Sequence, residues 1–115
     1  MNRDVWISAG VNYEEGIRRF LGNSALYEKF VLRFPGDPTY AALDAAMAQK
    51  DTAEAFRQAH TLKGAAGNLS FVQLYQDVQP LVEALRAQDQ AAADTLYPAV
   101  QADYIRLVDV LRAEG

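Results

Sequence analysis

The stretch DTAEAFRQAHTLKGAAGNL, residues 51–69, decides the fold that we expect for this chain. Small and apolar residues recur in it at intervals of four and three positions, at Ala55, Ala59, Leu62, Ala66 and Leu69. This spacing is typical of the apolar seam along which one helix of a bundle packs against its neighbours. Asp51 with Glu54 three residues later is an N-capping pattern, so the helix should begin at this point.

Similar patterns predict helices in most of the remaining chain. Their expected starts are capping residues followed by apolar positions at helical spacing, at Asn12, Asn23 or Ser24, Asp37, Ser70 and Asp89. The first of these helices should bury Ile17, Phe20 and Leu21. In the second, one apolar face should be formed by Leu26, Tyr27, Phe30, Val31 and Phe34. Pro80 and Pro98 fall inside the last two helices, where each should kink the helix or shift its boundary.

Four amphipathic helices with short connections favour antiparallel neighbours, because a short loop forces the next helix to run in the opposite direction. We therefore expect an all-α fold, an antiparallel up-down four-helix bundle over about residues 37–113. One or two short helices at about residues 11–35 should pack on it as an N-terminal extension. The whole chain, residues 1–115, is expected to form a single domain.

Composition argues against several classes of function. The chain has 11 basic and 15 acidic side chains, and a net charge of −4 argues against a general nucleic-acid binder. It has no cysteine and one histidine, so we expect no metal site. No apolar run approaches the roughly 18 residues of a membrane helix, and the N-terminus lacks the apolar core of a signal peptide. We expect no binding to a membrane and a cytoplasmic location.

The single histidine, His60, lies on the helix of residues 51–69 but not on its seam. At about 100° per residue the seam falls within roughly 40° of one direction, and His60 lies about 140° away from it. Gly64, one turn further on, should weaken the helix by about 1 kcal/mol relative to alanine, which indicates that something must approach the backbone closely. Lys63 is near enough to contact an anionic group attached to the imidazole. A plain solvated histidine is the alternative interpretation.

Two further residues extend this outward face into a small apolar patch suited to protein docking. Phe56 lies one turn before His60, and Gly67 lies about two turns after it. Each has an ordinary alternative interpretation. Phe56 can be a flank of the core, and Gly67 can fray the end of the helix.

The residues His60-Thr61-Leu62-Lys63-Gly64, followed by small residues up to Gly67, resemble the motif of the histidine-containing phosphotransfer (HPt) domain. The stretch Arg19-Phe20-Leu21-Gly22-Asn23, with Leu26-Tyr27 after it, resembles the N-terminal part of many such domains. The resemblance covers about residues 11–113. The chain departs from the family pattern at Ser70, where glycine is usual, and at Pro80, inside the helix that would pack beside the histidine.

The resemblance implies a relay in which His60 accepts a phosphoryl group from a receiver-domain phosphoaspartate and passes it to another receiver domain. Lys63 would stabilise the phosphoryl charge, and Gly64 would allow close approach of the partner. The residues implied to bind the partner are Phe56, Arg57, Gly67, Asn68 and Arg86. For Arg86 a solvated arginine is the alternative interpretation.

The partners that the resemblance implies are a response regulator and a hybrid sensor histidine kinase. The receiver domain would hold the Mg²⁺, so this chain would bind no cofactor and would not be an enzyme by itself. Imidazole is nucleophilic in its neutral form, which ordinary histidines populate near neutral pH.

Two other functions stay open at this point. A sensor histidine kinase fragment is also helical, but it usually has an acid directly after the phosphorylated histidine, where this chain has Thr61. A bundle used only for protein interaction would leave His60 unphosphorylated. With one acceptor histidine, the chain is expected to be a monomer. The start at Met1 favours a free-standing protein, and a piece of a larger hybrid kinase is the alternative.

Overall fold

The computed structural model describes residues 3–114, and these residues are mostly helical. The elements are α1 (Arg3–Ser8), α2 (Tyr13–Arg19), α3 (Ser24–Arg33), the short 3₁₀ helix η1 (Phe34–Gly36), α4 (Thr39–Ala48), α5 (Thr52–Asn68), α6 (Val72–Arg86) and α7 (Gln90–Glu114). Between residues 3 and 114 there is no strand, and extended pairing is limited to an isolated antiparallel bridge between Val11 and Phe71. The predicted all-α class is confirmed.

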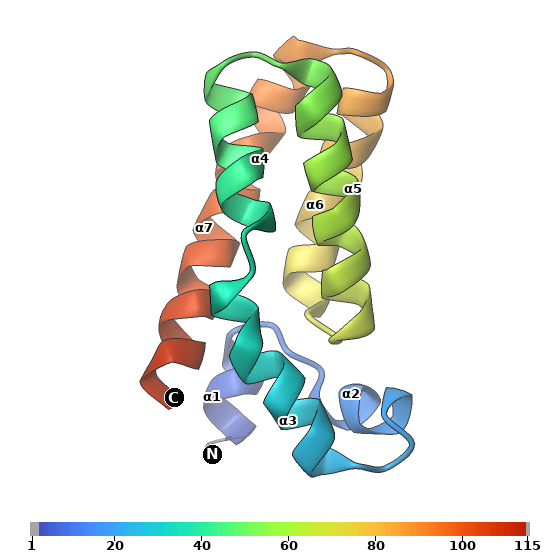
Figure 1. Cartoon of the computed structure of the whole chain (residues 1–115), viewed down its shortest axis with the longest axis vertical. Coiled ribbons are helices and arrows are strands. Elements are labelled where there is room, and N and C mark those ends of the chain that lie inside the picture. Colours follow the sequence, from blue (N-terminus) through green and yellow to red (C-terminus); the bar gives the residue numbers. More distant parts are fainter. Residues whose placement is uncertain (1–2, 115) are drawn as a thin grey trace.

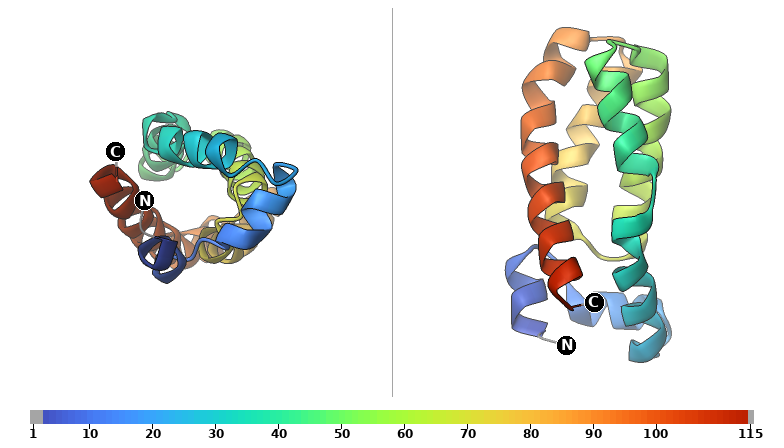
Figure 2. Two further views of the ribbon diagram at one scale, coloured as in Figure 1. Left: turned by 90° about the horizontal axis from the view of Figure 1, so that it is seen from below. Right: turned by 60° about the vertical axis from the view of Figure 1, so that its left-hand side comes forward.

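Helices α4, α5, α6 and α7 lie along the long axis of the molecule, which measures 39 × 25 × 21 Å (Figure 1). Short connections join successive helices alternately at the two ends of the molecule (Figure 1), and α5 packs on both α4 and α6. Helices α1, α2 and α3 gather at the end where α5 passes into α6 (Figures 1 and 2). We call these three helices, residues 3–33, the N-terminal unit.

Helices α2, α3, α4, α5 and α7 begin where the capping residues predict. The side chains of Asn12, Asn23, Asp51 and Asp89 each accept a hydrogen bond from the backbone N–H three residues further on, at 3.0–3.2 Å. Asp37 accepts from the backbone N–H of Thr39 at 2.8 Å, at the start of α4. Each bond satisfies a donor that a helix end would otherwise leave without a partner.

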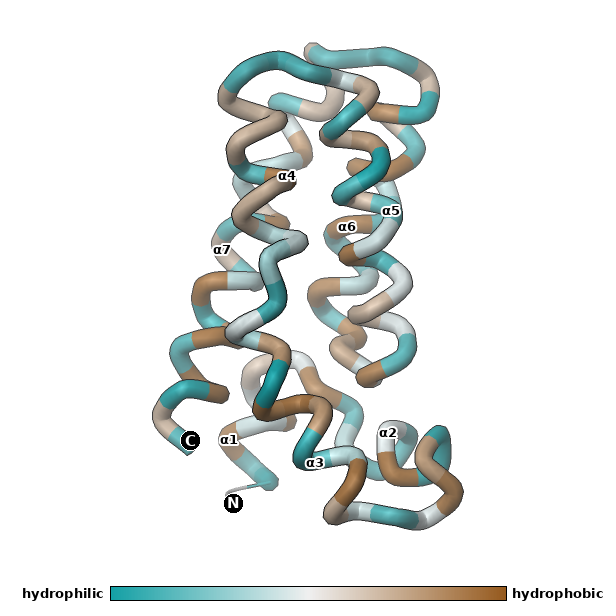
Figure 3. Tube along the Cα trace, viewed as in Figure 1, coloured by the Kyte–Doolittle hydropathy of each residue, from teal (hydrophilic) through white to brown (hydrophobic). Residues whose placement is uncertain are grey.

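Hydrophobic positions recur along each long helix and alternate with hydrophilic ones (Figure 3). In α5 the predicted seam is buried at Ala55, Ala59, Leu62 and Ala66, and Leu69 packs against the core while partly buried. Burial of this stripe against the neighbouring helices is the main free-energy gain of such a fold. Within residues 3–114 no helix is long and apolar enough to cross a membrane.

Pro80 lies inside α6 and Pro98 inside α7, and neither proline ends its helix. Of the two effects predicted for them, the shift of a helix boundary is not observed. Both side chains are exposed. The bundle therefore keeps the two helices continuous past residues that disfavour a helix interior.

The apolar pattern of the N-terminal unit gives one wrong prediction of burial. Leu21 is 97% exposed, because α2 ends at Arg19 and Leu21 falls in the following turn with a φ of 57°. On the predicted apolar face of the next helix, Tyr27, Val31 and Phe34 are buried, whereas Leu26 and Phe30 keep exposed side chains. Helix α1, which buries Trp6 completely, is not among the predicted helices.

Ser70 does not cap α6 as predicted. The residue before α6 is Phe71, and no side chain caps that helix end. Ser70 is 1% exposed and has a φ of 58°, a conformation that favours glycine. Its hydroxyl donates to Oε1 of Glu15 at 3.0 Å, so a tertiary hydrogen bond takes the place of the predicted local one.

The N-terminal unit is bound to the turn between α5 and α6. The backbone N–H of Asn12 donates to the carbonyl of Ser70 at 2.8 Å. The buried Tyr27 donates its hydroxyl to the carbonyl of Leu69 at 2.6 Å. Gly16 lies so close to the Tyr27 ring that a Cβ atom would fall 2.1 Å from Cζ. These contacts fix α2 beside the end of the helix that carries His60.

Candidate functional site

His60 is the middle residue of α5 and has an exposed side chain, as the helical pattern predicts. Its ring is 5.9 Å from the ring of Phe56, centroid to centroid, and Phe56 is partly buried against the core. Phe56 is therefore both a flank of the core and a neighbour of the imidazole. The next residue, Thr61, donates its hydroxyl to the carbonyl of Arg57 at 3.0 Å and so stays within its own helix.

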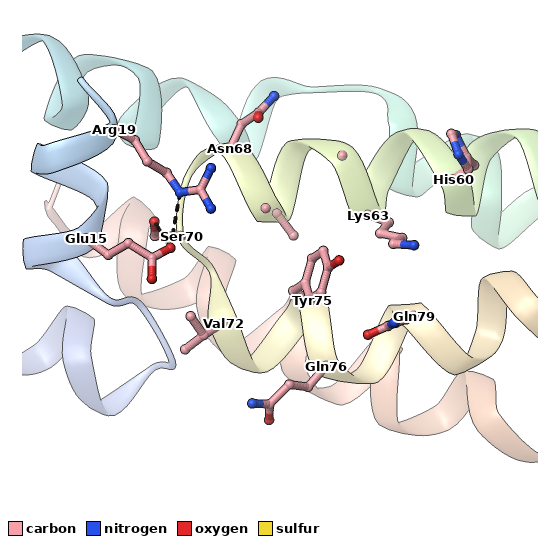
Figure 4. Close-up of a pocket in the computed structure, with 13 residues that line it drawn as sticks. Glu15, Arg19, His60, Lys63, Asn68, Ser70, Val72, Tyr75, Gln76 and Gln79 are labelled. Carbon is pink, nitrogen blue, oxygen red and sulfur yellow. Dashed lines mark hydrogen bonds and ion pairs between the residues drawn. The ribbon is translucent and has the colours of Figure 1, made fainter. Parts of the chain in front are cut away.

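A cleft of about 630 Å³ runs from His60 towards the N-terminal unit. Its residues from α5 are His60, Lys63, Gly64, Ala66, Gly67 and Asn68, and those from the turn and α6 are Ser70, Val72, Tyr75, Gln76 and Gln79. Glu15 and Arg19 of α2 close the end away from His60 (Figure 4). Two consecutive helices and α2, which is distant from them in sequence, therefore build one cleft beside the single histidine.

Lys63 lies on one wall of this cleft and faces α6 (Figure 4). Its Nζ is 5.9 Å from the centroid of the Tyr75 ring, which is within the range of a cation–π interaction. The side chain is one turn from His60 and half-buried. Lys63 can therefore supply positive charge next to a group attached to the imidazole.

The two glycines of the predicted patch differ in their surroundings. A Cβ atom at Gly64 would have no neighbour within 4 Å among the described residues, whereas one at Gly67 would lie 3.4 Å from Cε2 of Tyr75. Both residues are inside α5, Gly67 as the last residue but one. Packing within the chain therefore gives no reason for glycine at position 64.

The structure places Arg86 away from the cleft. Its Cζ lies 5.0 Å from the centroid of the Phe56 ring, and its Nε lies 3.4 Å from a carboxylate oxygen of Glu83. Phe56, Arg57 and Arg86 line a second hollow of about 660 Å³ between the start of α5 and the end of α6. The predicted site residues thus divide between this hollow and the cleft.

Arg57 is engaged on its own helix. Its guanidinium forms an ion pair with the carboxylate of Glu54, which also accepts a hydrogen bond from Gln58 at 2.7 Å. The bond from Gln58 and then the bond from Arg57 hold the pKa of Glu54 below its ordinary range. A partner that uses Arg57 would have to compete with this carboxylate.

Sequence reasoning missed the residues that α6 and α2 contribute to the cleft. Tyr75 and Gln79 are four residues apart on α6 and flank its buried stripe, so the helical pattern of α6 could have indicated them. Glu15 and Arg19 had no such signal. Glu15 reaches the turn between α5 and α6 through a contact with Ser70, 55 residues further along the chain.

Within residues 3–114 there is no group of three or more side chains arranged to hold a metal ion. The cleft offers a lysine, an arginine and amide groups, and its one carboxylate, Glu15, is paired with Arg19, so the lining suits an anionic partner group better than a cation. The prediction that this chain binds no cofactor stays a prediction.

The model of the Hpt domain family matches residues 37–110, which contain α4, α5, α6, most of α7 and the stretch His60–Gly64. The chain therefore belongs to the Hpt domain family. Comparison with curated proteins and comparison with solved structures give no match. Hpt domains are phosphotransfer carriers of two-component signalling and interact with receiver domains and kinases. The N-terminal unit lies outside the matched residues.

Proposed function

We propose that the protein is a phosphorelay intermediate in which His60 accepts a phosphoryl group from the phosphoaspartate of one receiver domain and passes it to another. The observation that carries this proposal is the position of His60. It is exposed on α5 at one end of a cleft, with Lys63 one turn away, inside the part of the chain that matches the family.

The proposed transfer exchanges one bond for another. The lone pair of the neutral imidazole, at Nε2, attacks phosphorus, and an N–P bond forms while the P–O bond to the aspartate breaks. The aspartate leaves as a carboxylate, and the proton on the other ring nitrogen can pass to water. Passing the group to the next receiver reverses these steps with a new aspartate as the nucleophile.

The neighbouring residues have proposed roles of position and charge. Lys63 stabilises the phosphoryl oxygens, and Gly64 lets the partner's loops approach the helix backbone. Phe56, Arg57, Gly67 and Asn68 contact the partner beside the reacting atoms. Arg86 contacts it from the second hollow, over the ring of Phe56.

The partner supplies what this chain lacks in the proposal. The receiver domain contributes the aspartate and the Mg²⁺, and this protein binds no cofactor and does not act as an enzyme alone. We place it in the cytoplasm as a monomer, with α4–α7 as an antiparallel four-helix bundle, between a hybrid sensor kinase and a response regulator.

The test is transfer of label from a receiver domain. Receivers are charged with a radioactive small phosphodonor and Mg²⁺, mixed with the protein, and the product is examined for acid-labile, base-stable phosphate. Because His60 is the only histidine, label on the wild type and none on His60→Gln supports the proposal. A labelled His60→Gln variant, or no transfer from a broad panel of receivers, would contradict it.

Two controls separate the alternative functions. Label from ATP in the absence of any receiver would favour a kinase fragment. Binding of a receiver without any transfer would favour a bundle used only for interaction. Removal of Mg²⁺ by a chelator should stop transfer but should leave label already on His60 in place, because the proposal assigns the metal to the partner.

A further inference from the structure

Arg19 belongs to the cleft of His60 although it lies outside the part of the chain that matches the family. It is the last residue of α2, and it stands on the ridge between this cleft and an adjoining hollow lined by Phe20, Phe30 and Leu69. Figure 4 shows its guanidinium at the end of the cleft away from His60. A partner that covers the cleft therefore meets Arg19 as well as the imidazole.

Arg19 is held in this place from one side. Its Nε donates to Oε1 of Glu15 at 3.1 Å, and the same oxygen accepts the hydroxyl of the buried Ser70 at 3.0 Å. Among the described contacts Arg19 uses only Nε, and its side chain is 50% exposed. The two terminal nitrogens of the guanidinium thus remain to bind a carboxylate from outside, which they match in geometry.

The charge around Arg19 fits a negative partner surface. The chain as a whole has a net charge of −4, but residues 13–33 carry four basic and three acidic side chains. One of those acids, Glu15, is paired with Arg19, and another, Glu28, accepts the hydroxyl of Tyr13 at 2.6 Å. Residues 13–33 therefore have a net positive charge within an acidic protein, which favours an acidic group on the partner.

We propose that Arg19 determines partner specificity by binding a carboxylate on the receiver domain while the phosphoaspartate of that receiver faces His60. Glu15 and Ser70 are positioning residues in this scheme, because they fix the guanidinium relative to α5. The inference rests on the proposed phosphotransfer and adds a second contact at the far end of the cleft. A receiver with no acidic side chain at that place is a poorer partner.

The experiment uses the full chain and the phosphorylated receiver that labels the wild type. Initial rates at increasing receiver concentration separate KM from kcat for Arg19→Glu and for Arg18→Glu. Arg18 is the matched control, because it is exposed on the same helix but does not line the cleft. We expect Arg19→Glu to raise KM by roughly threefold to tenfold with kcat nearly unchanged, and Arg18→Glu to raise it less than about twofold.

Further variants test the position of the charge. Arg19→Lys should raise KM less than Arg19→Glu does, since lysine keeps the positive charge but lacks the guanidinium fork. Glu15→Gln and Ser70→Ala should raise KM less than Arg19→Glu does, with kcat retained. The differences in KM between these variants and the wild type should become smaller at high salt, because salt screens exposed charges. Phosphoramidate, which phosphorylates imidazole with release of ammonia, should label His60 in every variant, which shows that the imidazole stays reactive.

The outcomes for this inference differ from those for the proposed function. If no receiver labels the wild type, the phosphotransfer proposal fails first. If transfer occurs but Arg19→Glu and Arg18→Glu raise KM equally, or if Arg19→Glu lowers kcat alone, the role of Arg19 is disproved while the relay stands. A rise in KM confined to Arg19→Glu supports it.

Discussion

At the scale of single residues, substitution of Gly64 should affect stability and phosphoryl transfer in opposite directions. Apart from its chain neighbours and the backbone of its own helix, no described atom lies within 4 Å of a Cβ built there, so alanine fits. Alanine favours a helix over glycine by about 1 kcal/mol. We expect Gly64→Ala to raise the free energy of unfolding by about 0.5–1 kcal/mol in urea denaturation. The same change should lower phosphoryl transfer by about tenfold or more, because a methyl group would displace the partner.

Gly67→Ala is the comparison for this variant. Its Cβ would meet the Tyr75 ring at 3.4 Å, so the gain in stability should be smaller. A Gly64→Ala protein that is less stable than the wild type, or one that transfers at the wild-type rate, would show that close approach of a partner is not the reason for the glycine.

Ser70 combines an unfavourable backbone conformation with a favourable hydrogen bond. Ser70→Ala removes the bond to Glu15 and keeps the φ of 58°, so it should lower the free energy of unfolding by about 1 kcal/mol. Ser70→Gly loses the same bond but relaxes the backbone, and it should be more stable than Ser70→Ala by roughly 1 kcal/mol. Urea denaturation of the wild type and the two variants gives the order of their free energies of unfolding. A Ser70→Gly protein less stable than Ser70→Ala would refute this account.

At the scale of elements, the prolines show where local propensity is a poor guide. A proline inside a helix disfavours it by about 3 kcal/mol, which predicts a break. Yet α6 buries Leu81, Val82 and Leu85 after Pro80, and α7 buries Val100 after Pro98. Burying several such side chains is worth more than the local loss, at about 1.5–3 kcal/mol for each. Packing against neighbours, which the sequence of one helix does not reveal, decides the outcome.

The packing of α2 on α3 depends on one glycine. A Cβ atom at Gly16 would overlap the ring of Tyr27, which has no exposed surface and is fixed by its bond to Leu69. We expect Gly16→Ala to destabilise the protein by about 2 kcal/mol or more through overpacking. The fluorescence of Trp6, the only tryptophan, should report the loosening because Trp6 packs on Tyr13 of α2.

Gly36→Ala serves as the matched control, since a Cβ there has no neighbour within 4 Å. It should leave the Trp6 spectrum unchanged and should shift the unfolding midpoint little. If Gly16→Ala behaves like Gly36→Ala, then α2 is not held against Tyr27 as described.

At the scale of the whole molecule, stability should depend on pH through carboxylates. Hydrogen bonds lower the pKa of three carboxylates below the ordinary values of 4.5 for glutamate and 3.8 for aspartate. The chief donor is Arg19 for Glu15, Gln58 for Glu54 and Lys50 for Asp94. The unfolded chain then binds more protons than the folded one as the pH falls, so stability is lost on acidification. We expect the urea midpoint to be level from pH 7 to about 5.5 and to fall between about pH 5 and 3.

Lys50→Gln tests the direction of this effect, because it removes the largest cause of the lowered pKa at Asp94. Its stability should fall less steeply with acid than that of the wild type. A midpoint that rises on acidification would contradict the assignment of these carboxylates.

The fold and part of the site were predictable because both follow from local sequence patterns. The seam of α5 and the caps at Asp51 and Asp89 are local patterns, and the outward face of that helix follows from the seam. Glu15 and Arg19 were not predictable, because their place in the cleft depends on a contact across 55 positions. Helix α1 escaped prediction because it has six residues and buries only Trp6.

The N-terminal unit has one more consequence, for how the domain fits into longer chains. Helix α1 packs on α7, so the first and last described helices, starting at Arg3 and ending at Glu114, meet at one end of the molecule (Figure 2). A fold that is entered and left at neighbouring points can be inserted between two other domains without stretching their linker. In such an insertion, the opposite end of the molecule, with the connections α4–α5 and α6–α7, would not contact the flanking domains.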